Sequence, residues 1–426
     1  MVELRPLRGW RFAVSATEDL GSRLAPPYDV ISPQRRQTLA SRHPHNIVHI
    51  DLPNEPADDE RYARAAARFR QWQAAAVLVR EAEPALYVLE QSFRLADGRR
   101  FTRTGLIGRL LIAPWGEGVL PHERTFPHAK ADRLALLAAT RAEFNPVFLL
   151  YSDPLGEVLA PLAEARRQPP LAIAHSDDSI DRLWAVTEPQ AIARVAERLA
   201  PRTLYVADGH HRYETALNYW RQADPADEAA RYVLACVVAM EDPGLVILAT
   251  HRCLHDVANF DTARLLRELD RHFELTPQSS DPELVASIAA APRGARVLGL
   301  ALAGQAGGYL LRLRASAVTL GALLAQEHPT VADLDVAALQ ALVLGPLFGI
   351  GRESHEQRPF IDFEPDAEAA LAGLRAGRYQ AVFLLTATRL SQLRALADAR
   401  QVAPPKATYF YPKLPSGMVI YDLDNP

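Results

Sequence analysis

The chain of 426 residues lacks several features that assign a sequence to a specialised class of protein. Its only cysteines, Cys236 and Cys253, cannot build the disulfide framework of a small secreted domain. Its longest apolar runs, such as residues 232–240, fall well short of a membrane span. Its first residues lack the charged start and the apolar segment of a secretory signal. We therefore expect a soluble, cytoplasmic protein with no membrane partner.

An excess of basic charge is lacking as well. The formal net charge is -4, and the 47 Lys and Arg residues are dispersed along the chain. Because a nucleic-acid-binding surface needs clustered basic residues, we expect no nucleic-acid partner. With 49% hydrophobic residues the chain is globular, and its length predicts two or three domains.

The richest chemistry lies in residues 203–217, whose pattern predicts a strand, a turn and a helix. Apolar residues 204–206 fit a buried strand, and the later apolar residues recur at the spacing of one helical face. Between them a carboxylate, a glycine, two imidazoles and a guanidinium follow one another: Asp208, Gly209, His210, His211 and Arg212.

This turn has the properties of an anion site, most suitably for phosphate. Asp208 is expected to be the N-cap, and Gly209 permits close backbone approach. The first N–H groups of the helix face outward at the positive end of its dipole. The planar guanidinium of Arg212 matches phosphate oxygens. The alternative is a capped core helix whose polar first turn is solvated.

A second dense segment, residues 119–134, contains His122 and Glu123. Glu123, next to a proline and an expected strand end, can act as a general base. The alternative is a surface ion pair with Arg124 or Arg133. The spacing of His122 and His128 does not match a His-Glu-x-x-His zinc helix.

Four further residues are candidates for phosphate contact. His251 and Arg252 follow an expected strand end, where a surface ion pair is equally common. Lys406 and Lys413 lie in a proline-bounded tail rich in aromatic residues. Lysines are usually solvated, and this is the alternative for both.

The remaining pattern predicts a mixed α/β fold in three regions, residues 1–100, 101–258 and 259–426, whose tail at 404–417 returns to the site. Expected strands include residues 47–52, 85–93, 102–113, 148–151, 181–186, 231–240, 245–249, 296–302, 308–313 and 381–385. Expected helices include residues 58–77, 131–143, 154–165, 189–199, 263–272, 282–290, 331–344, 364–376 and 391–400. The helix at 131–143 is expected to turn Leu134, Leu137 and Ala138 inward.

The sequence resembles a prokaryotic family, also found in some protists, that is known as a domain of unknown function. Its mark is the motif Asp-Gly-His-His-Arg-Tyr-Glu-Thr-Ala, which stands here at residues 208–216. Other motifs of the resemblance lie at residues 26–31, 121–125, 132–134, 250–252, 334–336, 405–406 and 408–413. One motif alone is weak evidence, whereas the ordered set covers nearly the whole chain.

The resemblance implies a fold and an activity. The family's core resembles the ParB/sulfiredoxin superfamily, whose members bind nucleotide phosphates at a Gly-x-x-Arg turn that opens a helix. Some members and related enzymes phosphorylate free L-serine to O-phosphoserine, and the related kinases carry an Asp-Gly-x-His-Arg turn and an upstream His-Glu pair. Residues 101–258 are thus expected to form a ParB/sulfiredoxin-like nucleotide-binding core of an ATP- and Mg²⁺-dependent kinase with a small amino acid as substrate.

The resemblance also implies roles for the candidate residues. Glu123 becomes the base, and Gly209, His211 and Arg212 become the phosphate cradle, with His211 also counted as catalytic. Asp208 would repel phosphate, so it is assigned to Mg²⁺ or to the substrate ammonium. The further cations expected to neutralise phosphate charge are His210, His251, Arg252, Lys406 and Lys413. Ala407 departs from the family's pattern, which has Ser there.

Two other functions stay open at this point. The same turn could serve a non-catalytic nucleotide switch, as in ParB proteins that load nucleotide to regulate DNA binding. A metal hydrolase would need His210, His211 and His251 on one ion, which is awkward because adjacent helical residues lie about 100° apart. The sequence identifies neither the acceptor nor the oligomeric state, and a homo-oligomer stays open.

Overall fold

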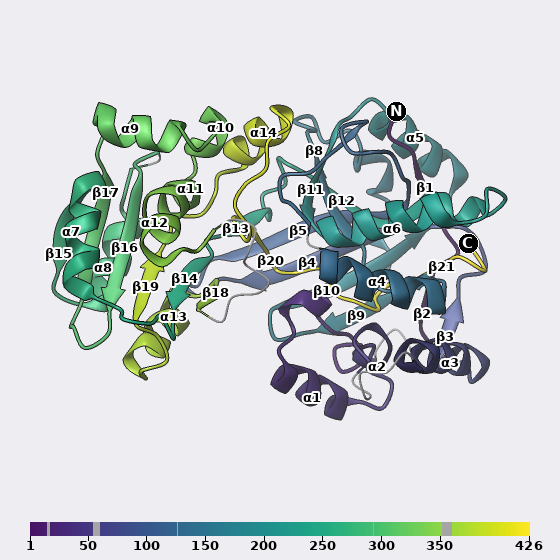
Figure 1. The fold of residues 1–426 in the computed structure, drawn as a ribbon. Helices are drawn as coiled ribbons and strands as arrows, with labels where there is room; N and C mark the ends of the chain where they lie inside the picture. Colours follow the sequence, from purple (N-terminus) through teal and green to yellow (C-terminus); the bar gives the residue numbers. More distant parts are fainter. Residues whose placement is uncertain (15–17, 54–59, 126, 293, 352–359) are drawn as a thin grey trace. The chain divides into compact units, whose positions relative to one another are not determined.

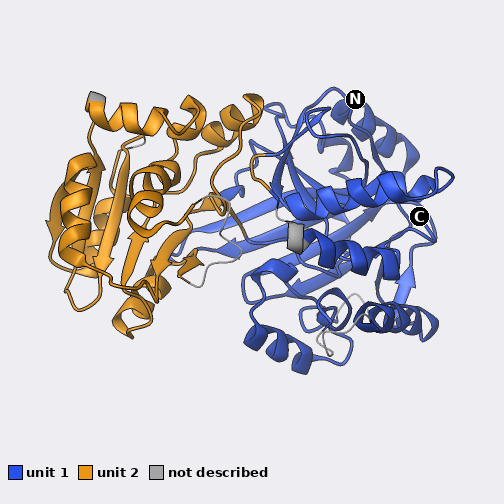
Figure 2. Ribbon diagram, in the orientation of Figure 1, with its two compact units in different colours: residues 1–121, 125–246, 412–426 blue, residues 122–124, 247–411 orange. Residues whose placement is uncertain are grey.

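The computed structural model describes residues 1–14, 18–53, 60–125, 127–292, 294–351 and 360–426, which form a mixed α/β protein as expected (Figure 1). The chain divides into two compact units (Figure 2). Unit 1 comprises Met1–Pro121, Thr125–Val246 and Pro412–Pro426, and unit 2 comprises His122–Arg124 and Ile247–Tyr411. None of the described helices is both long enough and apolar enough to cross a membrane.

The main sheet of unit 1 contains nine described strands. They are β1 (Leu4–Arg5), β4 (Leu86–Arg94), β5 (Arg100–Leu111), β6 (Val119–Leu120), β8 (Val147–Tyr151), β9 (Ala172–His175), β10 (Ser179–Val186), β11 (Leu204–Asp208) and β12 (Tyr232–Ala239). Their order is β6-β11-β8-β12-β5-β4-β10-β9, and β1 pairs with β5. The sheet is mixed, because β11 runs parallel to β6 and antiparallel to β8. Since β4 and β5 pair along their length, residues before 100 share this sheet with residues after it.

The helices of unit 1 are α1 (Pro33–Arg42), α2 (Val48–Asp51), α3 (Glu60–Ala74), α4 (Pro127–Thr140), α5 (Pro189–Leu199) and α6 (His210–Gln222). Val195 and Leu199 of α5 and Tyr213 and Leu217 of α6 join alternate strand residues in one buried cluster. The two helices therefore cover the same face of the sheet. Two small strand pairs complete the unit: β2 (Trp10–Phe12) with β3 (Leu78–Arg80), and β7 (Ala142–Glu143) with β21 (Tyr421–Asp422).

Unit 2 is built around a six-stranded sheet of described strands. They are β14 (His251–Leu254), β15 (Phe273–Gln278), β16 (Val297–Leu302), β17 (Gly308–Leu313), β18 (Ile361–Glu364) and β19 (Ala381–Leu384), and β13 (Val246–Leu248) pairs separately with β20 (Tyr409–Tyr411). The order is β15-β17-β16-β19-β14-β18, and all neighbours are antiparallel.

Helices cover both faces of the sheet in unit 2. They are α7 (Thr262–His272), α8 (Asp281–Ala289), α9 (Ala317–Leu324), α10 (Pro329–Ala332), α11 (Asp335–Leu339), α12 (Gly345–Phe348), α13 (Ala367–Arg375) and α14 (Leu390–Asp398). In β19, Ala381 and Phe383 belong to the core cluster that includes α7, whereas Val382 and Leu384 belong to the cluster that includes α8 and α13. This alternation is the period of two expected for a strand buried on both faces.

Most expected elements are confirmed, but the strand expected at residues 47–52 is wrong. Val48–Asp51 is a short helix. The Asn46 side chain accepts a hydrogen bond from Val48 N–H (2.9 Å) and donates to the carbonyls of Ser22 and Leu24. These contacts fix a helical start that the apolar alternation of the segment does not indicate.

The helix expected at residues 154–165 is also wrong. This stretch contains turns and two short 3-10 segments, Ala160–Leu162 and Ala165–Arg167. Gly156 has a left-handed backbone (φ 66°), Asp153 accepts a hydrogen bond from Val158 N–H (2.9 Å), and Pro161 has no N–H to donate.

Two smaller predictions about helices are also wrong, one about which residues of a helix are buried and one about whether a helix is continuous. Leu136 and Leu137 are buried in α4 while Ala138 is exposed, and residues 331–344 are divided among α10, α11 and a π-helical turn at Gln340–Leu344.

Candidate functional site

The turn between β11 and α6 is the centre of the candidate site in unit 1. The strand ends at Asp208 and the helix begins at His210, so the N-cap is Gly209 and not Asp208 as expected. Gly209 has a backbone φ of 91°, a conformation that residues other than glycine rarely adopt. A Cβ added at Gly209 would also lie 2.9 Å from Cζ of Arg212. Glycine therefore allows both the sharp turn and the return of the Arg212 guanidinium against it.

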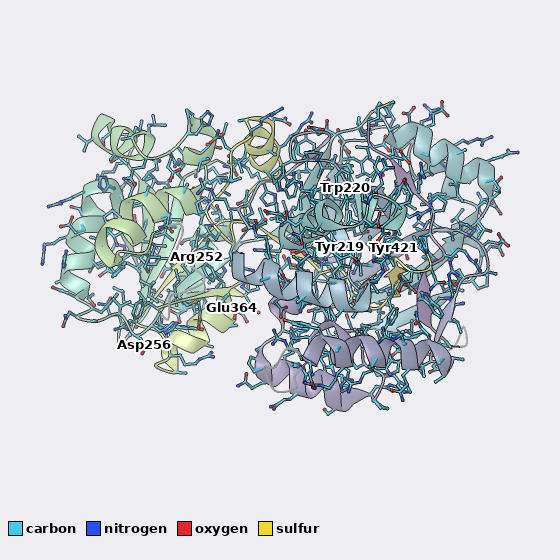
Figure 3. The ribbon with its side chains drawn as sticks, turned by 45° about the vertical axis from the view of Figure 1, so that its right-hand side comes forward. Tyr219, Trp220, Arg252, Asp256, Glu364 and Tyr421 are labelled. Atoms are coloured by element: carbon cyan, nitrogen blue, oxygen red, sulfur yellow. The ribbon has the colours of Figure 1, made fainter. Side chains whose placement is uncertain are left out.

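The first turn of α6 offers backbone N–H groups at the positive end of a helix of 13 residues. His211 and Arg212 are partly exposed in this turn, whereas His210 is 4% exposed. Further along, Tyr213, Ala216 and Leu217 are buried as expected, and Tyr219 and Trp220 follow on the same helix (Figure 3). The buried face of α6 thus fixes the position of the turn. The N-terminal end of the helix presents its free backbone N–H groups, beside the partly exposed side chains of His211 and Arg212.

Two cations converge on the carboxylate of Asp208. Arg212 donates through Nη2 to Oδ2, and Lys413 donates through Nζ to Oδ1. All three side chains are mostly buried, with 14%, 12% and 10% exposed for Asp208, Arg212 and Lys413. Arg212 also donates through Nη1 to Asn145 Oδ1 and to the Pro146 carbonyl. The structure therefore brings Asp208, Gly209, Arg212 and Lys413 together from two distant segments.

The position of Lys413 depends on a buried arginine. Arg103, 1% exposed, donates to the Pro412 carbonyl (2.6 Å) and to Gln91, and its guanidinium lies 4.7 Å from the ring centre of Phe148. Gln91 in turn donates to the Lys413 carbonyl (3.3 Å). Burial lowers the pKa of Arg103 to about 10, so it stays charged at neutral pH. The backbone on both sides of the Pro412–Lys413 bond is held from the sheet.

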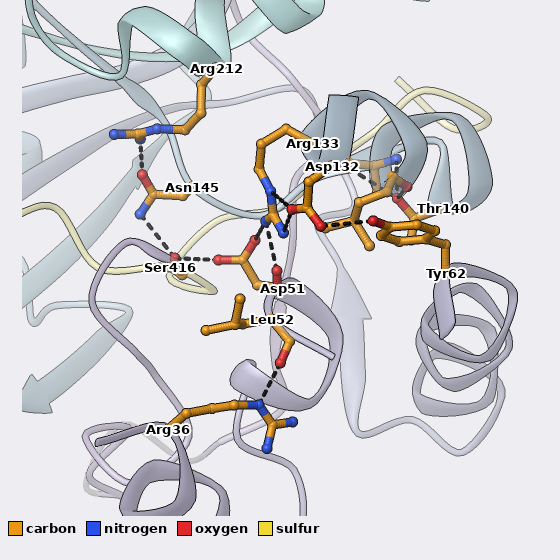
Figure 4. A network of polar contacts seen from close by, with 12 residues as sticks. Arg36, Asp51, Leu52, Tyr62, Asp132, Arg133, Thr140, Asn145, Arg212 and Ser416 are labelled. Carbon is orange, nitrogen blue, oxygen red and sulfur yellow. Dashed lines mark hydrogen bonds and ion pairs between the residues drawn. The ribbon is translucent and has the colours of Figure 1, made fainter. Parts of the chain in front are cut away.

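A chain of polar contacts links Arg212 to other motifs of unit 1 (Figure 4). Asn145 donates to Ser416 Oγ (3.1 Å), and Ser416 donates to Asp51 (2.9 Å). Asp51 accepts from Arg133 (3.1 Å), which also pairs with Asp132 (2.6 Å). The guanidinium of Arg133 lies 4.2 Å from the ring centre of Tyr28. Motif segments 26–31, 132–134 and 208–216 therefore belong to one network.

Thr125 and Lys130 are held by Glu214, which is also part of the 208–216 motif. Thr125 donates to Glu214 through its hydroxyl, and Lys130 pairs with the same carboxylate at 2.9 Å. Lys130 is thereby neutralised by α6 and adds no net charge to the turn. Arg133, the other partner considered for Glu123, pairs with Asp51 and Asp132.

The second group of candidate residues lies in unit 2. The backbone of Glu123 forms an isolated parallel β-bridge with Ala403, and its carboxylate accepts a hydrogen bond from the backbone N–H of Lys406. His122, 1% exposed, is 2.9 Å through Nε2 from Thr408 Oγ1. Lys406 has an exposed side chain and a left-handed backbone (φ 55°). Glu123 and Lys406 are thus brought together, with the tail as their frame.

His251 and Arg252 follow the expected strand, which is β13, but they themselves lie within a further strand, β14. Figure 3 labels Arg252. Arg252, 2% exposed, donates to the carbonyls of Thr250 (2.6 Å), Pro405 (2.9 Å) and Lys406 (3.1 Å). Burial lowers its pKa to about 10, while Glu123 acts in the opposite direction. These bonds make Arg252 a support of the tail, and its expected phosphate contact stays a prediction.

His251 is a neutral, buried imidazole. Burial, with Arg252 nearby, lowers its pKa to about 4. Its Nδ1 accepts a hydrogen bond from Leu385 N–H (3.1 Å), which leaves the proton on Nε2. His251 can therefore donate one hydrogen bond but carries no positive charge at neutral pH.

The described contacts of Asp208 do not fit a magnesium ligand. Mg²⁺ in nucleotide sites is held by one or two carboxylates together with phosphates and water. Both carboxylate oxygens of Asp208 are occupied by Arg212 and Lys413. Asp208 instead neutralises and orients two cations.

This role makes a prediction for Asp208→Asn. For the kinase reaction that the resemblance implies, we expect kcat to fall by about tenfold or more, because hydrogen bonds to charged groups are worth about 1.5–3 kcal/mol each. The Mg²⁺ concentration for half-maximal activity should stay that of the wild type. Initial rates over a range of Mg²⁺ concentrations measure both quantities, with the exposed Asp224→Asn as the control. A tenfold higher Mg²⁺ requirement in Asp208→Asn would instead make Asp208 a metal ligand.

Glu143 of β7 is a half-buried residue near the same turn, and its carboxyl accepts a hydrogen bond from Leu234 N–H. Burial raises its pKa to about 8, although Leu234 N–H and Arg212 act to lower it. Because the folded pKa lies above the ordinary value, its contribution to stability is full below the ordinary pKa of a glutamate. That contribution is lost as the pH rises to about 8, at no more than about 1.4 kcal/mol per pH unit.

We expect Glu143→Gln to remove this pH dependence. Its Tm should match that of the wild type near pH 5 and exceed it increasingly up to pH 8. Thermal unfolding across this range measures the difference, with the exposed Glu197→Gln as the control. Parallel Tm profiles for Glu143→Gln and the wild type would show that Glu143 is ionised in the folded protein.

Several residues of the site were missed from the sequence. No strong local sequence pattern marks four of these residues, Asn145, Ser416, Asp51 and Arg103, and their partners lie up to 365 residues away. Asn145 precedes a proline at a strand start, which is a weak signal. A buried arginine within an apolar alternating strand, as at Arg103, is the one signal that could have been followed, since such residues need partners.

Comparisons with known proteins place these observations in a family. No curated protein matches the chain significantly. A conserved hypothetical protein from Pyrococcus furiosus is similar in structure, with 13% identity, a TM-score of 0.37, and coverage of 72% of this chain and 93% of that one. A free serine kinase in complex with AMP has 13% identity, a TM-score of 0.37, and coverage of 72% and 88%. SbnI with a C-terminal truncation, from Staphylococcus aureus, has 10% identity, a TM-score of 0.35, and coverage of 72% and 84%.

The family comparison gives one match over most of the sequence. The model described as "Protein of unknown function (DUF1015)" matches residues 4–337, well over half of the chain. This confirms the resemblance to a domain of unknown function. The chain therefore belongs to the DUF1015 family.

Proposed function

We propose that this protein is an ATP-dependent small-molecule kinase that phosphorylates free L-serine to O-phosphoserine. The observation that carries the proposal is the Gly209 turn, where a helix N-terminus, Arg212 and Lys413 present positive charge to one point. The resemblance of this turn and of His122-Glu123 to those of serine kinases supplies the choice of reaction. Free serine is likewise the substrate for which the AMP-bound kinase is named.

The turn suits the phosphates of a nucleotide for physical reasons. Helix N-termini bind phosphate through free N–H groups and through the dipole. Arg212 has five N–H donors, and its contacts with Asp208, Asn145 and Pro146 use three of them. Phosphoryl transfer depends on positioning and on charge stabilisation, which a fixed guanidinium supplies without reorganisation. His211, partly exposed in the same turn, is proposed as a further donor to phosphate.

Glu123 is proposed as the general base. In this step its carboxylate takes the proton of the serine hydroxyl, and the hydroxyl oxygen forms a bond to the γ-phosphorus of ATP. The bond from that phosphorus to the bridging oxygen breaks, and ADP leaves with the electron pair. The hydrogen bond from Lys406 N–H orients one carboxylate oxygen. A base held in one orientation loses less entropy in the transition state.

The roles of the other cations follow from their exposure. Lys406 is exposed and is proposed to neutralise phosphate charge, together with Lys413. Arg252 is buried and is proposed to act through the tail backbone that it supports. His210 is also buried and is proposed to contribute to phosphate binding from the first turn of α6. Mg²⁺, when bound with ATP, would neutralise phosphate charge, and nothing in the proposal requires Asp208 as its ligand.

The test is an incubation of the purified full chain with ATP, Mg²⁺ and L-serine, followed by measurement of ADP and O-phosphoserine. L-threonine, L-homoserine and D-serine in parallel define the acceptor. We expect equal amounts of ADP and O-phosphoserine with L-serine. ATP binding without any phosphorylated product, for every acceptor, would reject the kinase and favour a nucleotide-binding switch.

A further inference from the structure

Unit 2 contains a cavity of about 390 Å³ that the proposed kinase chemistry does not use. It lies beside the end of β19, with the loop before β16 and the first residues of α11 and α14 in its wall. The volume is in the range of small-molecule sites, about 300–1,000 Å³. The wall includes Asp335, which belongs to the motif at residues 334–336 that has no role so far.

One part of the wall is apolar. Val285, Ile288 and Ala289 come from α8, and Leu384 and Leu385 come from the end of β19. These side chains offer no hydrogen bonds, so they favour an aliphatic part of a ligand over a polar one.

The other part of the wall is charged in a balanced way. It has two arginines, Arg296 and Arg389, and two aspartates, Asp333 and Asp335. Arg389 pairs with Asp333 at 3.3 Å, and both are partly exposed. Arg296 and Asp335 influence each other electrostatically, yet among the described residues no direct ion pair joins them. Two opposite charges therefore face one cavity without neutralising each other by contact.

The polar atoms of this wall are incompletely used. The Nε atoms of Arg296 and Arg389 are buried and have no hydrogen-bond partner within the described part of the chain. These two atoms are closed to the cavity, whereas the positive charge of the Arg296 guanidinium lies in its wall and would attract a carboxylate bound there. Asp335 accepts one hydrogen bond from Thr386, and burial raises its pKa to about 6. A bound ammonium would stabilise its ionised form.

A ligand that matches the apolar part of the wall together with Arg296 and Asp335 has an aliphatic side chain, a carboxylate and an ammonium. We propose that this cavity is a binding site for a free aliphatic α-amino acid, with its carboxylate at Arg296 and its ammonium at Asp335. Apart from His251, the wall contains none of the residues considered for phosphate contact or for phosphoryl transfer, so the proposal does not depend on the kinase. His251, which also lines the cavity, can donate through Nε2 to the same carboxylate.

The test uses the full chain and measures L-leucine, L-isoleucine and L-methionine by calorimetry and by Tm. Isoamylamine and 4-methylpentanoate, which lack one charge of leucine, are the matched ligands. We expect saturable binding of at least one amino acid, and at least tenfold weaker binding of both analogues. Analogues that bind as well as the amino acid, or the absence of binding by all three amino acids, would overturn the proposal.

Variants locate the site. Asp335→Asn keeps an acceptor for Thr386 and should weaken amino-acid binding at least tenfold, and Arg296→Gln should do the same. The exposed Asp270→Asn variant should bind like the wild type.

Because Arg296 also donates to the Ala332 carbonyl, a loss of folding could obscure the effect of Arg296→Gln on binding. Ala289→Leu, at an exposed position of the wall, provides a second route, since its larger side chain should narrow the cavity and weaken binding at least tenfold with Tm unchanged. Unchanged affinity in both Asp335→Asn and Ala289→Leu would place the ligand elsewhere.

Discussion

Glu123→Gln is expected to lower kcat for O-phosphoserine formation by about 10²–10⁴-fold, the usual contribution of a general base. The amide keeps the size of the side chain and keeps an oxygen that can accept from Lys406 N–H. It cannot take a proton from a hydroxyl, so only the chemical step should suffer. Initial rates at saturating ATP and L-serine measure this effect, together with the Kd of ATP by calorimetry.

The two readouts separate a base from a structural residue. A base predicts a fall in kcat with the Kd of ATP and the Tm unchanged. The exposed Glu117→Gln, on a loop of unit 1, should have the rate of the wild type. Full turnover by Glu123→Gln would remove the base from Glu123 and leave the nucleotide assignment intact.

Arg212→Lys is expected to weaken ATP binding by about 30-fold. Lysine keeps the charge but loses the planar fork that reaches phosphate and protein acceptors together, and each lost charged hydrogen bond costs about 1.5–3 kcal/mol. A loss of about 2 kcal/mol corresponds to this change in Kd. Calorimetric titration with ATP and with ADP measures it below the melting temperature of each protein.

The matched control is Arg221→Lys, in the last turn of the same helix, where the side chain is exposed. Its Kd should equal that of the wild type. Because Arg212 also holds Asn145 and Pro146, Arg212→Lys should have a lower Tm as well. Equal affinity for ATP in Arg212→Lys and the wild type would exclude Arg212 from the phosphate site.

The sequence predicted the local frame of the site well. The spacing of Tyr213, Ala216 and Leu217 identified the buried face of α6, and the apolar run before Asp208 identified β11. These predictions succeeded because a helix or strand that packs on a core must repeat its apolar residues at its own period. The N-cap was misplaced by one residue, because aspartate and glycine are both common there and the choice depends on backbone conformation.

The contacts that give the site its charge could not be predicted in the same way. Lys413 meets Asp208 over 205 residues of sequence, and Ser416 meets Asp51 over 365. No periodicity records such pairs, because each depends on where the last strand and tail fold back within unit 1. The proposed role of Asp208 changed for this reason: two cations on its carboxylate make it an organiser of positive charge, whereas the sequence suggested a ligand of Mg²⁺ or of the substrate ammonium.

The assignment of His251 and Arg252 changed through burial. From the sequence they followed a strand and were free to reach a phosphate. In the structure they lie in β14, where Arg252 supports the tail and His251 is neutral. The expected strand ends before Thr250 as β13, and the second strand, β14, depends on pairing with β18 and β19, which come more than a hundred residues later.

The most direct test of the central claim follows the γ-phosphoryl group of ATP. ATP whose γ-phosphate carries ¹⁸O at its terminal oxygens is incubated with the protein, Mg²⁺ and L-serine, and the products are analysed by mass spectrometry. Direct transfer predicts O-phosphoserine that carries all the labelled terminal oxygens, in equal amount with ADP. Labelled inorganic phosphate with no phosphoserine, or ATP that is bound and recovered unchanged, would contradict the account.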